Sequence, residues 1–343
     1  MTPAPQPVVF EPIYKPKPWG GRTLARLFGR TLPGTEPIGE SWELSDLPGN
    51  ESRVARGPLT GRTIGELVRM WGKALLGNAP LADGRFPLLI KFLDAREALS
   101  VQVHPCAADP QGRPPATIKH EAWYVIAAEP EAKLFIGLRP GVGPADVRRA
   151  AATPATAELL QPRPARPGRC FYLPAGVPHA LGAGIVVAEV QTPSDVTYRL
   201  YDWDRVGLDG RPRELHIEQA LANLRHDVPD SEIVQPRSHV ADVFITVTRL
   251  VVCERFLVDK VRMSAGIARS LPHAEMVIWI VLAGGGQLTR DGEACEFGPG
   301  DVVLIPAEAE ALRVETAADC EFLEVKIPIP SPLPARPRSG RAQ

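Results

Sequence analysis

The sequence has few of the features that direct a protein to a membrane, a secretory route or a nucleic acid. Its 343 residues include five cysteines, an odd number without a CxxC pair, which indicates free thiols in a reducing cytoplasm. It has no apolar run of about 18 residues, and its N-terminus lacks the basic start and apolar core of a signal peptide. The formal net charge of -1 favours neither nucleic acid nor an anionic membrane as a partner. We therefore expect a cytoplasmic protein with neither kind of partner.

Four residues in the first half of the chain could supply ligands to one metal ion. Gln102 and His104 are two apart in a run typical of a β-strand, which points both side chains to one face. Glu121 lies in a second such run, and His179 ends a segment that begins at Gly168 and fits the pattern G-x5-P-x-G-x2-H. Any one of these residues is more often an ordinary core or surface residue. Together their N and O atoms suit Zn²⁺, Fe²⁺, Mn²⁺ or Co²⁺, and they predict a metal site.

The same motif occurs again near the C-terminus in a degenerate form. The segment from Gly300 keeps the glycine, the five-residue strand and the proline, but Glu308 replaces the second glycine and Ala311 replaces the histidine. Upstream, residues 276–286 echo residues 122–128, with no glutamate at the position of Glu121. Because the motif is the second signature of the cupin fold, the repeat predicts two β-barrel modules. Only the first is expected to bind metal.

The predicted fold is mostly β, with two cupin-type (jelly-roll) β-barrels and a few short helices. We expect a flexible N-terminus at 1–9, a catalytic cupin module with short helical insertions at 10–227, a degenerate cupin module at 240–327 and a disordered tail at 328–343. Apolar spacing after a capping Thr63 predicts a helix through residue 76. Further helices are expected at about 143–152 and 213–224.

Several motifs resemble those of class I mannose-6-phosphate isomerases, and the chain is similar to their short bacterial form. They are residues 87–93, 98–105, 119–124, 173–181 and 188–205, within a similarity that covers about residues 8 to 327. In that family the metal is usually zinc, so the resemblance implies one Zn²⁺ per chain at Gln102, His104, Glu121 and His179. It also implies that Arg199 matches the family's proposed catalytic residue. Cys106 is a departure, because the family tends to have an acidic or amide residue there.

The reaction that the resemblance implies interconverts mannose 6-phosphate and fructose 6-phosphate through a cis-enediol(ate). It needs an acid/base and a cation beside the developing oxyanion. The expected catalytic residues are Arg199, Lys119 and Glu189, and the expected substrate-binding residues are Lys91, Ser100 and Lys119. Because the pKa of arginine is far above neutrality, Arg199 is expected to relay a proton or stabilise the oxyanion. Its partner would be Glu189 or a metal-held water, unless Glu189 is only a buried carboxylate paired with Arg199.

Two other functions remain open on the sequence, an Fe(II) dioxygenase and a non-catalytic sugar-sensing cupin. Gln102 in the first ligand position disfavours the dioxygenase, because a facial triad needs only three protein ligands. The intact first site with its surrounding cations disfavours the sensor. The expected partner is a sugar phosphate, and the oligomeric state is either monomer or homodimer. Four histidines stand in no ligand pattern and are expected to have surface or local hydrogen-bonding roles, namely His216, His226, His239 and His273. Trp19, Trp42 and Trp123 could line a sugar pocket, but an aromatic residue in a β-barrel is more often part of the core.

Overall fold

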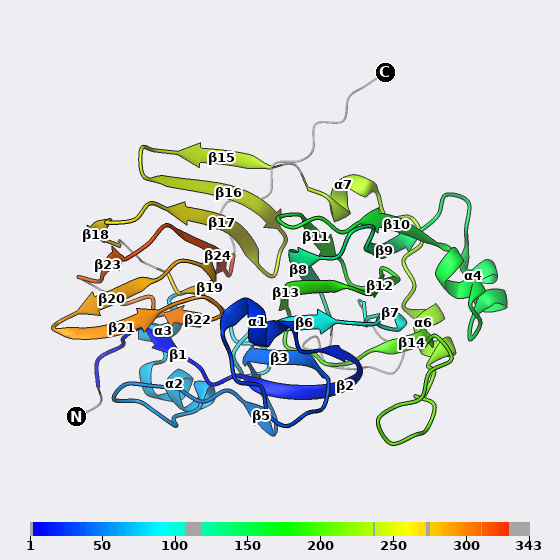
Figure 1. Cartoon of the computed structure of the whole chain (residues 1–343), viewed down its shortest axis with the longest axis horizontal. Coiled ribbons are helices and arrows are strands. Elements are labelled where there is room, and N and C mark those ends of the chain that lie inside the picture. Colours follow the sequence, from blue (N-terminus) through cyan, green and yellow to red (C-terminus); the bar gives the residue numbers. More distant parts are fainter. Residues whose placement is uncertain (1–2, 107–117, 236, 272–274, 310, 329–343) are drawn as a thin grey trace.

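The protein is built from two modules, each made of two antiparallel β-sheets (Figure 1). The computed structural model describes residues 3–106, 118–235, 237–271, 275–309 and 311–328. The mostly β prediction is confirmed, and each module is a pair of packed sheets. No helix in these residues is long and apolar enough to cross a membrane.

The first module packs a six-stranded sheet against a five-stranded sheet. In spatial order, the larger sheet contains β11 (Cys170–Leu173), β8 (Glu121–Ala128), β13 (Ile185–Gln191), β6 (Leu89–Ala95), β2 (Ile13–Gly21) and β3 (Ile38–Leu44). The smaller sheet contains β10 (Leu160–Pro164), β9 (Lys133–Leu138), β12 (His179–Leu181), β7 (Val101–Val103) and β14 (Tyr198–Tyr201). Alternate residues of the two sheets, such as Trp123 and Ile136, form the core between them.

The second module repeats this plan with a seven-stranded and a four-stranded sheet. The larger sheet contains β1 (Val8–Val9), β22 (Val302–Ile305), β19 (Val277–Ala283), β24 (Cys320–Lys326), β17 (Leu257–Met263), β16 (Ile245–Val252) and β15 (Ser238–Ala241). The smaller contains β18 (Ala268–Ser270), β23 (Arg313–Thr316), β20 (Gly286–Arg290) and β21 (Glu293–Phe297). A separate two-stranded ribbon is formed by β4 (Asp46–Leu47) and β5 (Asn50–Glu51).

The two modules share one hydrophobic core where their larger sheets meet. Phe92 and Tyr124 of the first module belong to the same buried cluster as Ile280 and Leu323 of the second. The N-terminal residues add to this connection, because Val8 and Val9 pair with Leu304 and Val303 and are buried. The segment 1–9, expected to be flexible, therefore ends in a strand of the second module. The boundaries 10–227 and 240–327 stay a prediction, and 329–343 of the expected tail lies outside the described residues.

Strand register aligns the two copies of the motif and places Ile278, rather than Met276, at the position of Ala122. Leu173 of β11 pairs with Glu121, and Ile305 of β22 pairs with Val277, so Val277 stands at the position of Glu121. Two positions further along, Trp279 corresponds to Trp123. The second module thus has an aliphatic side chain where the first has a carboxylate.

Seven short helices are described, and they lie outside the sheets. The predicted helix after Thr63 is confirmed with its capping box, but Gly72, at φ 49°, divides it into α2 (Ile64–Trp71) and α3 (Lys73–Leu76). Helix α6 (Ile217–Ala222) starts four residues later than expected, because the backbone N–H of His216 is bonded to the Arg199 carbonyl of β14. The others are α1 (Thr23–Phe28), α4 (Pro144–Ala150), α5 (Ala155–Glu158) and α7 (Asp230–Ile233).

Candidate active site and metal centre

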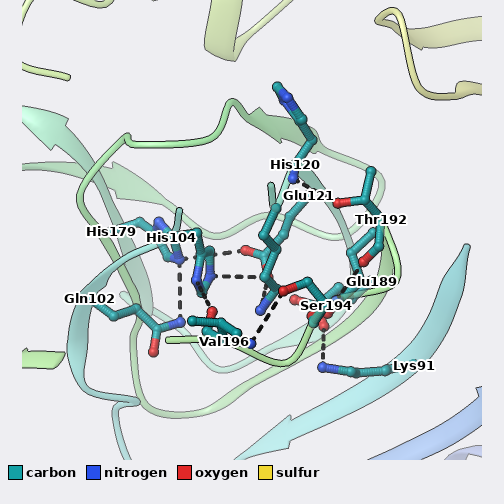
Figure 2. A network of polar contacts seen from close by, with 12 residues as sticks. Lys91, Gln102, His104, His120, Glu121, His179, Glu189, Thr192, Ser194 and Val196 are labelled. Carbon is teal, nitrogen blue, oxygen red and sulfur yellow. Dashed lines mark hydrogen bonds and ion pairs between the residues drawn. The ribbon is translucent and has the colours of Figure 1, made fainter. Parts of the chain in front are cut away.

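The four predicted ligands meet between the two sheets of the first module (Figure 2). Gln102 of β7 pairs in register with His179 at the start of β12, so the smaller sheet holds these two side by side. His104 follows β7 on the same side as Gln102, and Glu121 begins β8 in the larger sheet. The Pro174–Gly176 turn, with Gly176 at φ 85°, returns the chain so that His179 enters this space.

The two imidazoles and the carboxylate form a compact buried cluster. His104 Nε2 lies 3.2 Å from Glu121 Oε1, and His179 Nε2 lies 3.5 Å from Glu121 Oε2. The three candidate ligand atoms all lie within 4.8 Å of one another. No other group of three His, Cys, Asp or Glu residues comes together in this way in the described part of the chain.

Hydrogen bonds fix both imidazoles in the tautomer that a metal requires. His104 Nδ1 donates to the Val196 carbonyl at 3.0 Å, and His179 Nδ1 donates to the Val177 carbonyl at 2.8 Å. Each ring therefore presents an unprotonated Nε2 to the cluster. Burial, the largest effect, lowers the pKa of His104 to about 3, which keeps this ring neutral. His104 Nε2 and Glu121 Oε2 are buried and make no hydrogen bond with any described residue.

These unpartnered atoms fit a divalent cation. Buried polar atoms without partners are costly, and a cation would satisfy both the imidazole nitrogen and the carboxylate oxygen. Gln102 differs from the other three ligands, because its amide Nε2 lies 3.3 Å from His179 Nε2 while Ser100 donates to its Oε1 at 3.1 Å. The Gln102 amide must turn over before its oxygen can act as a ligand.

A cavity of about 250 Å³ opens beside the cluster and brings the other predicted site residues together. Its lining includes all the predicted catalytic and substrate-binding residues, namely Lys91, Ser100, Lys119, Glu189 and Arg199. Gln102 and Glu121 line it as well. Sequence spacing alone could not predict that these residues lie around one cavity, because they come from both sheets.

Charged side chains in the larger sheet form a buried network. Lys91 Nζ lies 3.3 Å from Glu189 and 3.7 Å from Glu40, and Lys119 Nζ lies 2.7 Å from Glu121. Burial and the nearby charge of Glu121 raise the pKa of Glu189 to about 7, against the lowering effect of Lys91. Burial would likewise raise the pKa of Glu40, but Lys91 and other partners hold it at about 2. Glu40 is thus a fixed anion, whereas Glu189 can exchange a proton near neutrality.

Arg199 is not paired with Glu189, which was one alternative considered from the sequence. Its Nη1 donates to the Glu214 carbonyl at 2.8 Å, and its buried Nε has no hydrogen-bond partner among the described residues. Glu189 is paired with Lys91 and accepts a 2.8 Å hydrogen bond from Trp123 Nε1. The alternative pairing of Glu189 with Arg199 is therefore wrong, because the two side chains have other partners and no hydrogen bond or ion pair joins them among the described residues.

The cavity is also lined by residues that were not predicted to belong to the site. His216 lines it rather than having a purely local role, and Trp19, Trp42 and Trp123 are buried in its wall. Lys17, Glu40, Asp195, Thr197 and Arg213 were not singled out, and all of them line the cavity. His273 lies outside the described residues. Arg213 and His216 stand in no motif of the sequence, and what brings them to the cavity is the pairing of this segment with β14, where the backbone N–H of His216 bonds to the Arg199 carbonyl.

The two-sheet fold and the buried His–Glu–His cluster define a metal-dependent enzyme of the cupin class. Comparison with known sequences makes the assignment specific, because the family model described as phosphomannose isomerase type I, catalytic domain, matches residues 9–131. The chain belongs to this family of isomerases, as its similarity to curated relatives over nearly their whole length shows.

Curated relatives include mannose-6-phosphate isomerase ManA of Bacillus subtilis, which is 33% identical over 317 residues covering 92% of this chain and 98% of the relative. The mannose-6-phosphate isomerase of Streptococcus mutans is 35% identical over 301 residues, covering 88% of this chain and 92% of the relative. The crystal structure of the mannose 6-phosphate isomerase from B. subtilis superposes with a TM-score of 0.83 at 30% identity, covering 94% of this chain and 100% of that structure.

Proposed function

We propose that the chain interconverts mannose 6-phosphate and fructose 6-phosphate as a metal-dependent aldose–ketose isomerase. The observation that carries this function is the His104–Glu121–His179 cluster beside a cavity that is lined by a buried carboxylate, Glu189. Family membership agrees with the function and disfavours both the dioxygenase and the non-catalytic sensor. A cytoplasmic location and a monomeric or homodimeric state stay predictions.

One Zn²⁺ per chain is the proposed cofactor, held by His104, Glu121 and His179, with Gln102 as the fourth ligand once its amide has turned. Neutral imidazoles, a carboxylate and an amide oxygen suit this ion, and the orphaned atoms of the cluster support its presence. When bound, the cation would supply Lewis-acid stabilisation of negative charge on substrate oxygens. Val277 and Ala311 at the matching positions are the reason to expect no second ion.

Glu189 is the proposed base that moves the proton between C1 and C2. In the direction of fructose 6-phosphate, the C2 proton passes to Glu189 and returns at C1, while O2 loses its hydrogen and O1 gains one. The raised pKa of Glu189 matches this exchange, because a base works best when its pKa lies near the working pH. Lys91 and Trp123 hold the carboxylate in place through their 3.3 and 2.8 Å contacts.

The cations of the cavity are proposed to bind substrate and stabilise the enediolate. Lys119 lies beside Glu121, where its ammonium can donate to a substrate oxygen. Arg199 stands opposite Gln102 in the strand register, so its guanidinium can stabilise the developing oxyanion. Lys91 and Ser100 complete the proposed substrate contacts with hydroxyl groups.

A coupled assay tests the function directly. The purified protein should form fructose 6-phosphate from mannose 6-phosphate, lose this activity on removal of metal by a chelator and regain it with added Zn²⁺. Absence of turnover by the metal-loaded protein would reject the isomerase function. Oxygen consumption with a sugar substrate would instead support the dioxygenase.

A further inference from the structure

A turn between β13 and β14 connects two of the candidate metal ligands. It runs from Thr192 to Val196, and it leaves β13 beside Glu121, because Gln191 pairs in register with that ligand. At the other end of the turn, the Val196 carbonyl accepts the hydrogen bond from His104 Nδ1. Figure 2 shows the turn passing from Thr192 to Val196, which lies beside His104. The turn therefore joins a ligand of the larger sheet to a ligand that follows a strand of the smaller sheet.

The first half of the turn is anchored to the segment that precedes β8. The backbone N–H of Thr192 donates to the His120 carbonyl at 3.1 Å, and the Thr192 hydroxyl donates to the Ile118 carbonyl at 2.8 Å. The backbone N–H of Ser194 donates to the Thr192 carbonyl at 2.7 Å, which closes a three-residue turn around the residue between them. These bonds fix the beginning of the turn and leave its second half to other partners.

The side chain of Gln191 holds the turn from the interior of the protein. This side chain is fully buried, and its amide Nε2 donates to the carbonyls of both Thr192 and Ser194. Ser194 is itself buried, and no other donor reaches its carbonyl among the described residues. The Ser194 carbonyl therefore depends on Gln191, because a buried backbone carbonyl requires a hydrogen-bond donor.

The two partners of Gln191 fix the orientation of its amide. Both carbonyls can only accept, so the NH₂ group must face them and Oε1 must point away. Oε1 is buried and makes no hydrogen bond with any residue in the described part of the chain. Because a buried acceptor without a partner is costly, the amide contributes favourably only through the two bonds that it donates to the turn.

The second half of the turn transmits this support to His104. The backbone N–H of Val196 donates to the Ser194 hydroxyl at 3.4 Å, and Gln191 holds the carbonyl of the same serine. The Val196 carbonyl, 3.0 Å from Nδ1 of His104, keeps the proton on that nitrogen and leaves Nε2 available to a cation. Without the Gln191 amide, the Ser194 carbonyl would lose its donor and the turn would move to regain one.

We propose that Gln191 is a positioning residue for the metal centre, which acts through the 192–196 turn to hold His104 as an Nε2 ligand. Gln191 is not among the residues that line the cavity, so its effect on the reaction is indirect. Residues that orient a metal-binding histidine typically contribute about 10- to 100-fold to metal affinity. The inference rests on the proposed metal centre of the isomerase.

The test compares Gln191→Met with Gln161→Met. Methionine has a similar length and removes both amide donors. Gln161 is the matched control, because its Nε2 donates to the Leu138 carbonyl at 2.7 Å in β10, at the edge of the smaller sheet. The affinity for Zn²⁺, measured by competition with a chromophoric chelator, should fall by about 10- to 100-fold in Gln191→Met and stay unchanged in Gln161→Met.

The tautomer of His104 is a readout that a merely structural role of Gln191 would not change. Nitrogen NMR of histidine-labelled, metal-free protein should show His104 protonated at Nδ1 in the wild type and in Gln161→Met. Its signal is identified by its loss in His104→Ala. In Gln191→Met, His104 should instead show a mixture of the two tautomers, because the Val196 carbonyl no longer selects one.

Ser194→Ala tests the turn independently, because it keeps Gln191 and removes only the hydroxyl that accepts the Val196 N–H. It should weaken Zn²⁺ binding less than Gln191→Met. In free energy, the double variant should lose less than the sum of the two single effects, because both residues act through one turn.

Three results would overturn the inference. They are unchanged Zn²⁺ affinity and His104 signals in folded Gln191→Met, an equal loss of affinity in Gln161→Met, and, if Gln191→Met does not fold, unchanged affinity in Ser194→Ala. If the wild type binds no Zn²⁺, the proposed metal centre fails, and the His104 signal of the metal-free protein still decides whether Gln191 orients this ring.

Discussion

Replacing Glu189 by glutamine should abolish most of the turnover while leaving the site assembled. The amide keeps an oxygen that can accept the hydrogen bond from Trp123 Nε1, now 2.8 Å long. Lys91 keeps Glu40 at 3.7 Å, so it is not left as an unpaired buried cation. The change therefore removes the proton acceptor with little disturbance of its neighbours.

The size of the effect follows from the role of Glu189 as a base. Positioned acid–base groups contribute about 10²- to 10⁴-fold to rate, or about 2.7 to 5.5 kcal/mol of barrier, and Glu189→Gln should lower kcat by such a factor. The assay measures kcat at saturating mannose 6-phosphate together with bound metal and the melting temperature. A kcat within about threefold of the wild type, with metal bound, would refute the assignment of the base.

The second module supplies a matched control for this substitution. Glu324 accepts a 2.9 Å hydrogen bond from Trp279 Nε1, as Glu189 does from Trp123. Strand register places Glu324 opposite Trp279 and Glu189 opposite Trp123. Glu324→Gln should therefore leave kcat unchanged, because no metal cluster or substrate lies beside it in our account.

Three further predictions concern other parts of the account. The raised pKa of Glu189 means that its proton is lost as pH rises through about 7, so kcat/KM should fall on the acid side, and Glu189→Gln should lose this dependence. The negative charge of Glu121 helps to raise the pKa of Glu189, and a metal cation bound to Glu121 would offset that charge and lower the pKa. An acid limb of the pH profile centred well above pH 7 would therefore contradict the assignment of Glu189 as the base. Arg199→Lys should lower kcat by at least about 100-fold, with a smaller change in KM, in steady-state assays. Thr63→Ala should cost about 1 kcal/mol in urea unfolding without changing kcat, because it removes only the cap of α2.

The sequence predicted those parts of the site that depend on local spacing. Gln102 and His104 share a face because they are two apart in a strand, and the glycine–proline motif identified His179. The internal repeat could also be recognised in the sequence, since the degenerate motif keeps its first glycine and its proline. Their positions in the structure agree with these expectations, whereas the roles of the side chains stay proposals.

The other parts of the site and the fold depend on strand pairing between segments that are distant in the sequence. Such pairing leaves little recognisable pattern in the sequence around each residue. Glu40 and Trp42 reach the cavity because β3 joins the sheet beside β6, and nothing in their own neighbourhood indicates a site. Glu189 and Arg199 are ten residues apart, but the chain crosses from one sheet to the other between them. The two-residue strand β1 is too short to show periodicity, and its pairing with β22 fixes it.

The most direct test of the central claim measures bound metal and isomerase activity in the same samples. Wild-type protein should contain about one metal ion per chain, and His179→Ala should lose both the ion and the activity. His239→Ala is the matched control, because His239 contacts Thr248 in the second module, and it should keep both. A full equivalent of metal with normal isomerase activity in His179→Ala would contradict the account.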